Sequence, residues 1–273
     1  MSGRPPGTPP RLLTIAGSDS GGGAGIQADL KTFAAHGGYG MSAITAITAQ
    51  NTLEVTAVHA LPPELVAAQI DAVFADIGVD AVKVGMLAEA AIVEAVAERL
   101  HAWAGPPVVV DPVMVSKSGA ALLRDDAVAA LRERLIPLAT VVTPNLPEGA
   151  RLLGEPIAAD QQEASARRLA ALGPAVLLKG GHGEGEELVD VLVYAGRMWR
   201  FSHRRLAISS THGTGCTLAS AIAARLGRGD ALEEAVGGAL AYLQRALRAA
   251  FPLGGGRGPV RHDVAADTVG GET

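Results

Sequence analysis

The residues best suited to chemistry lie in one glycine-rich segment, His212-Gly213-Thr214-Gly215-Cys216. A helical pattern begins at Thr214, directly after the first glycine. Glycines let several backbone N–H groups point at one spot, and a helix N-terminus adds partial positive charge there. The segment therefore predicts an anion hole for a phosphate group, built by Gly213, Thr214 and Gly215. A glycine-rich helix start with a buried, inert cysteine is the simpler alternative.

Cys216 occupies the position from which a side chain would reach the bound phosphate. A base placed there would take the proton of a substrate hydroxyl, and we expect the helix N-terminus to lower the pKa of the thiol. Cys216 is also the only cysteine of the chain, which excludes an internal disulfide and is typical of a reducing cytoplasm.

Two charged residues follow predicted buried strands. Lys179 stands before Gly180-Gly181-His182, where its ammonium would lie beside phosphates. Asp111 closes another strand before Pro112, and an unpaired carboxylate is costly in such a position. A metal ion or a lysine is the expected partner of Asp111.

Asn145 and Glu148 stand three positions apart at the start of a predicted helix, so their side chains share one face. They could hold Mg²⁺ through water, because Mg²⁺ takes few protein ligands. The same pair is equally typical of a helix N-cap completed by a capping box.

The first glycine-rich loop, 17–25, supports two weaker interpretations. A P-loop is excluded, because Gly23 and Ala24 stand where Lys and a hydroxyl residue would be needed. Residues 23–28 do fit G-x-G-x-x-A, with Glu54 downstream as a possible ribose ligand of a dinucleotide. A tight strand-to-helix turn explains the same glycines without any ligand.

The elements that must position these residues alternate between strands and helices. Such alternation predicts βαβ units, hence an α/β fold with a mainly parallel sheet and helices on both faces. Ligands bind such sheets beyond the carboxyl ends of the strands, where the polar residues above are found. We expect one domain over 12–262, with a disordered lead-in at 1–11 and a disordered tail at 263–273. Strands are expected at 12–16, 41–50, 56–61, 81–84, 108–110, 140–142, 175–178, 188–194 and 197–202, and helices at 24–36, 63–77, 88–104, 125–135, 163–172 and 214–250 with a break near 227–229.

Composition narrows the function further. The 273 residues are 48% hydrophobic but only 3% aromatic, and the net charge is −5. Without a basic stripe or interleaved aromatics, a nucleic-acid surface is not expected. No apolar run reaches the roughly 18 residues of a membrane helix, and the N-terminus lacks a signal-peptide core, so we expect a soluble cytoplasmic protein. The histidines show no zinc-ligand spacing, and no Gly-x-Ser-x-Gly elbow of a serine hydrolase is present.

Taken together and in order, these motifs closely resemble the hydroxymethylpyrimidine/phosphomethylpyrimidine kinases of thiamine biosynthesis. The resemblance runs from about Leu12 to His262. It is carried by the segments 13–19, 22–29, 48–52, 83–87, 143–148, 179–182 and 212–216.

The resemblance implies a ribokinase-like three-layer α/β sandwich. It also implies that ATP phosphorylates the alcohol of 4-amino-5-hydroxymethyl-2-methylpyrimidine, and that a second ATP converts the monophosphate to the diphosphate. ATP is the expected co-substrate, Mg²⁺ the expected ion and a homodimer the expected assembly.

The resemblance also implies roles for individual residues. Gln50 would read the aminopyrimidine edge, since an amide supplies both a donor and an acceptor. Asn145 and Glu148 match a metal-binding element of the superfamily. Asp111 is a third candidate ligand of the metal ion. The residues expected to contact ATP are Lys179, Thr211 and Asn145. The expected lining of the pyrimidine pocket is Gly17, Asp29, Gln50, Met86 and Val113.

One residue distinguishes the branches of the superfamily. Sugar-kinase relatives carry Asp after Gly-Thr-Gly, whereas Cys216 matches the pyrimidine kinases and their pyridoxal-kinase-like cousins. Pyridoxal kinase therefore remains the nearest alternative. A non-catalytic pyrimidine- or pyridoxal-binding module and a dinucleotide-dependent oxidoreductase are more distant ones.

Overall fold

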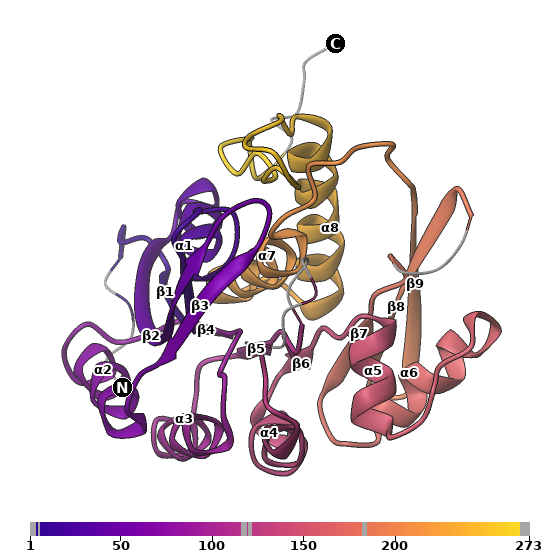
Figure 1. Ribbon diagram of the computed structural model, residues 1–273. Coiled ribbons are helices and arrows are strands. Elements are labelled where there is room, and N and C mark those ends of the chain that lie inside the picture. Colours follow the sequence, from indigo (N-terminus) through magenta and orange to yellow (C-terminus); the bar gives the residue numbers. More distant parts are fainter. Residues whose placement is uncertain (1–3, 5, 116–118, 120–121, 182–184, 268–273) are drawn as a thin grey trace.

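The computed structural model describes residues 4, 6–115, 119, 122–181 and 185–267. The described residues form one nine-stranded sheet with the order β3-β2-β1-β4-β5-β6-β7-β8-β9 (Figure 1). Its strands are β1 (Arg11–Asp19), β2 (Tyr39–Gln50), β3 (Val55–Ala60), β4 (Ala81–Val84), β5 (Val108–Val110), β6 (Val141–Val142), β7 (Ala175–Leu178), β8 (Glu187–Tyr194) and β9 (Arg197–Arg204).

The centre of the sheet is parallel and its two ends are antiparallel. All neighbouring pairs from β2 across to β7 run parallel, while β3, β8 and β9 each pair antiparallel with their neighbours. The prediction of a mainly parallel sheet is confirmed, and the antiparallel ends make the sheet a mixed one. The strands expected at 188–194 and 197–202 are present as β8 and β9, which form a hairpin, and its turn residues Ala195 and Gly196 both have positive φ.

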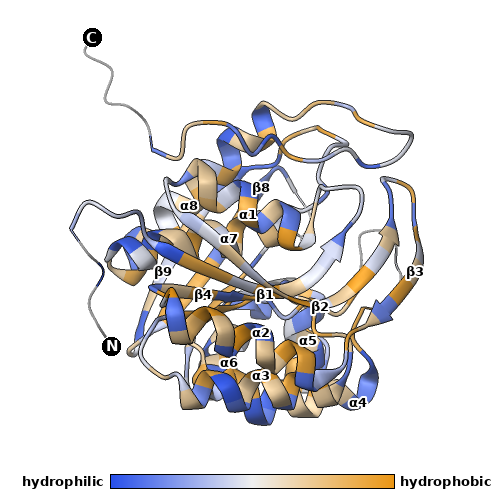
Figure 2. Cartoon of the chain, turned by 90° about the vertical axis from the view of Figure 1, so that its left-hand side faces the viewer, coloured by the Kyte–Doolittle hydropathy of each residue, from blue (hydrophilic) through white to orange (hydrophobic). Residues whose placement is uncertain are grey.

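Helices cover both faces of the sheet, so the described chain has three layers. One layer contains α1, α7 and α8, and the other contains α2 to α6 (Figure 2). The helices are α1 (Gly25–Ala35), α2 (Pro63–Asp76), α3 (Ala90–Ala102), α4 (Asp125–Ala130), α5 (Leu146–Leu153), α6 (Gln162–Ala170), α7 (Thr214–Arg228) and α8 (Leu232–Arg248).

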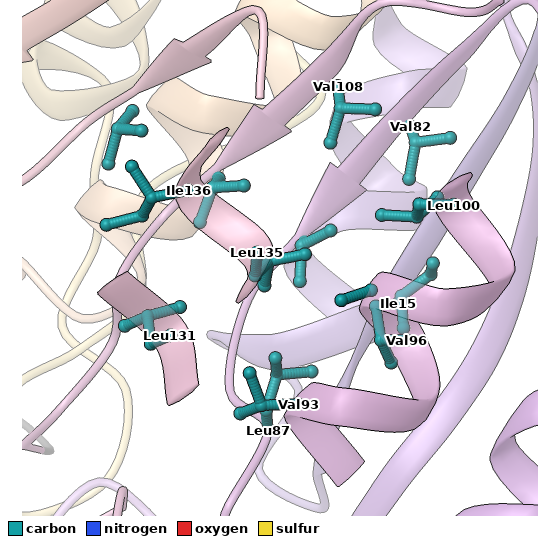
Figure 3. Close-up of a cluster of buried hydrophobic side chains, with 14 of the residues drawn as sticks. Ile15, Val82, Leu87, Val93, Val96, Leu100, Val108, Leu131, Leu135 and Ile136 are labelled. Atoms are coloured by element: carbon teal, nitrogen blue, oxygen red, sulfur yellow. The ribbon is translucent and has the colours of Figure 1, made fainter. Parts of the chain in front are cut away.

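Each helical layer encloses its own apolar core, and strand alternation divides the residues between the two. Ile15 and Val82 pack against α3 on one side (Figure 3), whereas Leu12 and Ala81 belong to the cluster beneath α7 and α8. Successive strand residues point to opposite faces, so one buried strand serves both cores. The central strands are therefore apolar along their whole length, as β4 and β7 are, apart from Lys83.

Most predicted elements are observed, with differences that have local causes. The long helical region breaks where expected, because α7 ends at Gly229 with φ 101°. The helix expected at 125–135 is α-helical only through Ala130. It continues as a π-helical turn (Leu131–Leu135) and a 3₁₀ turn (Ile136–Leu138), because Pro137 cannot donate a backbone hydrogen bond.

The C-terminal segment has a structural role that composition did not predict. Residues 252–267 form no helix or strand, yet Pro259 pairs with His212 as an isolated bridge. Val260 and His262 are buried there. The expected lead-in and tail lie partly outside the described residues, and the domain boundaries stay a prediction. None of the described helices is long and apolar enough to cross a membrane.

Candidate active site

The predicted anion hole lies against the first glycine-rich loop. Gly213 is the N-cap of α7 with φ 81°, and a Cβ atom there would lie 1.8 Å from the carbonyl oxygen of Gly23. A Cβ on Gly23 would in turn lie 2.4 Å from Cδ2 of the His212 ring. Both glycines are therefore required for the two loops to touch. This contact explains Gly23 of the G-x-G-x-x-A pattern by packing. Gly25, the second glycine, has φ 54° and a Cβ there would lie 2.4 Å from the carbonyl oxygen of Gly17, so local packing explains it as well.

Asp19 organises the first loop and connects it to the second. Its carboxylate accepts hydrogen bonds from the backbone N–H groups of Gly21, Gly23 and Ala24, and its Oδ2 lies 2.8 Å from Nε2 of His212. Burial alone would raise the pKa of Asp19, but the hydrogen bonds from His212 and the backbone lower it below its ordinary value. The sequence patterns did not indicate this role of Asp19, because its partner His212 stands 193 positions away in the chain.

Gln50, the predicted reader of the pyrimidine, lies beside this network. Its Nε2 is 3.3 Å from Nε2 of His212, and its Oε1 is 3.3 Å from the Thr48 hydroxyl. The side-chain amide is partly exposed, so a ligand can reach it. The structure thus brings Gln50 next to the residue that precedes the anion hole.

Lys179 and Asp111 form an ion pair at the other side of the anion hole. Nζ of Lys179 lies 3.0 Å from Oδ1 of Asp111, which also accepts from the Thr143 hydroxyl. Burial lowers the pKa of Lys179, but the Asp111 and Glu148 carboxylates outweigh it and the pKa is raised. A Cβ on Gly215 would lie 3.3 Å from Asp111 Oδ2 and 3.6 Å from Lys179 Nζ. The ammonium therefore adjoins the start of α7, and a lysine is the partner of Asp111.

Asn145 and Glu148 form the capping box at the start of α5. The Asn145 side chain accepts from the Glu148 N–H, and the Glu148 carboxylate accepts from the Asn145 N–H, both at 2.8 Å. Asn145 also lies beside Lys179 in an isolated parallel bridge. The capping alternative is therefore observed, and the metal role of the pair stays a prediction. Among the described residues, no three His, Cys, Asp or Glu side chains converge on a metal-sized site.

Cys216 differs from its expected state. Its sulfur accepts a hydrogen bond from the Gly25 N–H, and burial raises the pKa of the thiol to about 11. Lys83 opposes this rise, whereas Asp29 and Asp111 add to it. The prediction that the helix start lowers the thiol pKa is therefore wrong. The reason is that burial and two nearby carboxylates outweigh the Lys83 ammonium and the hydrogen bond from the Gly25 N–H.

The remaining predicted pocket residues occupy different depths. A Cβ on Gly17 would lie 3.0 Å from Sδ of Met86, so these two predicted residues are in contact. Val113 is partly exposed two residues beyond Asp111. Asp29 is fully buried, and both of its carboxylate oxygens accept hydrogen bonds from neighbouring side chains. Whether Asp29 contacts a ligand stays a prediction.

Thr211, the last predicted ATP residue, precedes His212. Its hydroxyl oxygen is buried and has no hydrogen-bond partner among the described residues. A buried hydroxyl of this kind can donate to an anion. The site as a whole combines the predicted anion hole, an ammonium, a partly exposed amide and a thiol, and such groups can position a phosphate and stabilise its charge.

Comparison with known proteins agrees with this chemistry. The family model described as phosphomethylpyrimidine kinase matches residues 19–261. The chain belongs to the phosphomethylpyrimidine kinase family. The resemblance carried by the motifs is thereby confirmed, and the dinucleotide-dependent oxidoreductase is set aside.

Individual relatives are similar over most of the chain. A hydroxymethylpyrimidine/phosphomethylpyrimidine kinase of Rhizobium meliloti is 54% identical, over 92% of this chain and 96% of the relative. The thiamine biosynthesis bifunctional protein ThiED of Geobacter sulfurreducens is 53% identical over 94% of this chain. This chain spans only 53% of that bifunctional relative, about half of its length.

Solved structures share the fold. Phosphomethylpyrimidine kinase from Clostridium difficile is 46% identical with a TM-score of 0.78, over 87% of this chain and 99% of that one. Pyridoxal kinase from Bacillus subtilis, solved as an ADP complex, is 39% identical with a TM-score of 0.86, over 93% of this chain and 98% of that one. A phosphomethylpyrimidine kinase and a pyridoxal kinase thus both have the architecture of this chain.

Proposed function

We propose that this protein is an ATP-dependent kinase of 4-amino-5-hydroxymethyl-2-methylpyrimidine, with the ribokinase-like three-layer sandwich as its scaffold. The observation that carries the proposal is the position of Gly215. It stands in the predicted anion hole at the start of α7 and directly adjoins the Lys179–Asp111 pair. A γ-phosphate bound there would meet backbone N–H groups on one side and an ammonium on the other.

The pyrimidine is expected to lie between the two glycine-rich loops and the end of β4. Gln50 would donate to a ring nitrogen and accept from the 4-amino group, because its amide carries both functions side by side. Gly17, Met86 and Val113 supply apolar walls for a flat ring. Asp29 would support this pocket from below.

Phosphoryl transfer itself requires mostly positioning and charge stabilisation. The alcohol oxygen forms a bond to the γ-phosphorus, the bond between that phosphorus and ADP breaks, and the alcohol proton passes to a base. Cys216 is the proposed base, and Gly213, Thr214 and Gly215 stabilise the charge that develops on the transferred group. The same residues would act a second time when the monophosphate is the acceptor.

ATP would be held by Lys179, Thr211 and Asn145. The Asp111 carboxylate pairs with the Lys179 ammonium, the Glu148 carboxylate raises the pKa of Lys179, and Asn145 lies beside Lys179 in a backbone bridge. The oxygen atoms of these three side chains are of the kind that suits Mg²⁺. When bound, Mg²⁺ would neutralise phosphate charge during transfer. A homodimer is proposed by analogy with the family.

Pyridoxal phosphorylation is the second candidate, and one observation favours it. The solved structures include pyridoxal kinases from Bacillus subtilis and Staphylococcus aureus with TM-scores of 0.86 and 0.87. Pyridoxine also offers a hydroxymethyl group on a flat heteroaromatic ring. A binding module without catalysis is less well supported, because Lys179, Asn145, Glu148 and the anion hole are all present.

A coupled ADP-release assay tests the proposal. Hydroxymethylpyrimidine, its monophosphate and pyridoxal are offered separately with ATP and Mg²⁺, and we expect turnover of the first two. Gln50→Leu should abolish that turnover while leaving any slow hydrolysis of ATP unchanged. Turnover of pyridoxal alone would replace the proposal with the second candidate, and turnover of none would refute both.

A further inference from the structure

A fully buried ion pair lies beneath Cys216. Nζ of Lys83 is 2.9 Å from Oδ2 of Asp29, and both side chains are 0% exposed. The hydroxyls of Thr14 and Ser220 complete the shell of Asp29, at 2.6 and 2.7 Å. Burying two charges costs more than an apolar pair of the same volume would. Such a pair inside an apolar core therefore calls for an explanation beyond stability.

The helices α1 and α7 place this pair one turn below the thiol. Gly25 and Asp29 are four residues apart on α1, and Cys216 and Ser220 are four residues apart on α7. Gly25 donates to the Cys216 sulfur, and one turn further Asp29 accepts from Ser220. Residues four apart lie on one helix face, about one 5.4 Å turn from each other. The thiol and the carboxylate thus face the same seam between the helices.

The Lys83 ammonium extends along β4 toward the active site. Lys83 and Gly85 are two residues apart and share one face of the chain, and a Cβ on Gly85 would lie 2.7 Å from Nζ. The missing side chain of Gly85 therefore makes room for the ammonium beneath the phosphate loop.

Lys83 donates one hydrogen bond among the described residues. An ammonium carries three N–H donors, and the hydrogen bond to Asp29 is the one that the described residues provide. In a fully buried position, a further acceptor for this ammonium is worth most. A group that gains negative charge during the reaction would be such an acceptor.

We propose that Lys83 is a positioning residue of the phosphoryl-transfer centre, whose ammonium, anchored by Asp29, stabilises the negative charge that forms at Cys216 when its thiol gives up a proton. The inference rests on the proposed role of Cys216 as the base. The charged groups that face the thiol are Lys83 of β4, Asp29 of α1 and Asp111 after β5. Lys83 favours the thiolate, and the two carboxylates oppose it.

The proton balance is simple. The Cys216 S–H bond breaks and its proton passes to water, and the ammonium compensates the thiolate. The thiolate then takes the proton of the substrate hydroxyl while the alcohol oxygen bonds to phosphorus and ADP leaves. The thiol is restored at the end of each turnover and must lose its proton again.

Alkylation of the ligand-free protein tests the inference, because Cys216 is the only cysteine. Iodoacetamide rates are measured from pH 6 to 10 in the wild type, Lys83→Met and Asp29→Asn. We expect slower alkylation in Lys83→Met and faster alkylation in Asp29→Asn. Each unit of thiol pKa should change the rate about three- to fourfold, because the thiolate fraction changes tenfold while intrinsic nucleophilicity changes the other way.

Ser220→Ala is the matched control, because it removes a hydrogen bond to Asp29 but no charge. Its rates should stay within about twofold of the wild type. Circular dichroism checks that each variant is folded, and if Lys83→Met is not, Lys83→Gln, which can still donate a hydrogen bond to Asp29, takes its place. Equal rates in the Lys83 variant and the wild type, or shifts of the Lys83 and Asp29 variants in one direction, would overturn the inference.

The outcome is separate from that of the proposed function. Alkylation needs neither ATP nor a pyrimidine, so a failed kinase assay leaves the thiol measurement valid. Conversely, the other outcome is an active kinase in which Cys216 is alkylated at the same rate with and without Lys83. That result would support the proposed function and refute the proposed role of Lys83.

Discussion

The ammonium of Lys179 and the carboxylate of Asp111 are joined at 3.0 Å, although the residues stand 68 positions apart and β6 lies between their strands. The pair exists because parallel strands end at the same edge of the sheet. Each residue can stay charged in this buried position because the other compensates it. The pair thereby places an ammonium next to Gly215 at the start of α7.

Replacing Lys179 tests that charge. We expect Lys179→Met to lower kcat/KM for ATP about 100-fold or more, because a preorganised donor to the phosphates is lost. The unfolding free energy should fall by about 3 kcal/mol, because Asp111 keeps its charge without its cation. Steady-state kinetics and urea unfolding measure the two effects. Arg168→Met, which breaks an exposed ion pair with Glu155, is the control and should change neither.

The backbone at Gly213 should tolerate no side chain. Gly213→Ala would drive a Cβ into the Gly23 carbonyl and force an alanine to φ 81°, so we expect loss of activity together with a lower Tm. Gly229→Ala is the matched control. It has φ 101° at the end of α7, but nothing lies within 4 Å of its Cβ position, so it should lose stability and retain kcat. Equal activity losses in both variants would contradict a specific role for the loop contact.

The two roles of Asn145 can be separated. Asn145→Ser keeps an oxygen that caps α5 but removes the amide, so stability should change by less than about 0.5 kcal/mol. If Asn145 also serves the metal–ATP complex, the Mg²⁺ concentration for half-maximal rate should rise severalfold. Asn145→Ala should lose both the cap, about 1 kcal/mol, and the Mg²⁺ response. An unchanged Mg²⁺ titration in the serine variant would show that capping α5 is the only one of the two roles that Asn145 has.

Cys216 is tested by truncation. Cys216→Ala should reduce kcat while the KM for the pyrimidine stays within about twofold, because a base acts on the transition state rather than on binding. Steady-state kinetics with hydroxymethylpyrimidine and saturating ATP measure both constants. A parallel loss of pyrimidine affinity would show that Cys216 is a wall of the pocket.

The buried His262 should make stability depend on pH. Burial lowers its pKa to about 4, from an ordinary value of 6.5. The unfolded chain then binds the extra proton between these values, so stability is complete above about pH 6.5 and declines as the pH falls toward 4. Burial also lowers the pKa of His36, which adds to the same decline.

The measurement is Tm against pH from 4 to 8. His262→Gln should flatten part of the decline, whereas His59→Gln, on an exposed position of β3, should leave it unchanged. His262 contacts the Thr217 hydroxyl, which donates to the Gly213 carbonyl. A profile that is identical in His262→Gln and the wild type would contradict the assignment.

Some of the site was accessible from local patterns. The strand and helix periodicities, the glycine-rich start of α7 and the polar residues after strands are properties of short segments, and they predicted the layers, the edge of the site and the break before α8. The sequence motifs, taken together, also predicted the family. These features depend on backbone geometry and neighbouring residues, which the order of amino acids specifies directly.

Other features required distant residues to meet. The capping box and the metal element share one pattern at Asn145 and Glu148, and only the folded chain showed that the box is made. The role of the C-terminal segment was missed, because a loop without periodicity gives no sign that Val260 and His262 become buried. Asp19 likewise could be assigned only when His212 was seen beside it.

The sequence by itself determined the fold class, the glycine-rich start of α7 and the kinase family, because each depends on residue types at short spacings. The tertiary structure decided the direction in which the pKa of the Cys216 thiol is shifted and the pairing of Lys83 with Asp29. Charge and burial at one atom are sums over groups from α1, β4, β5 and α7, and no single segment of the chain contains them.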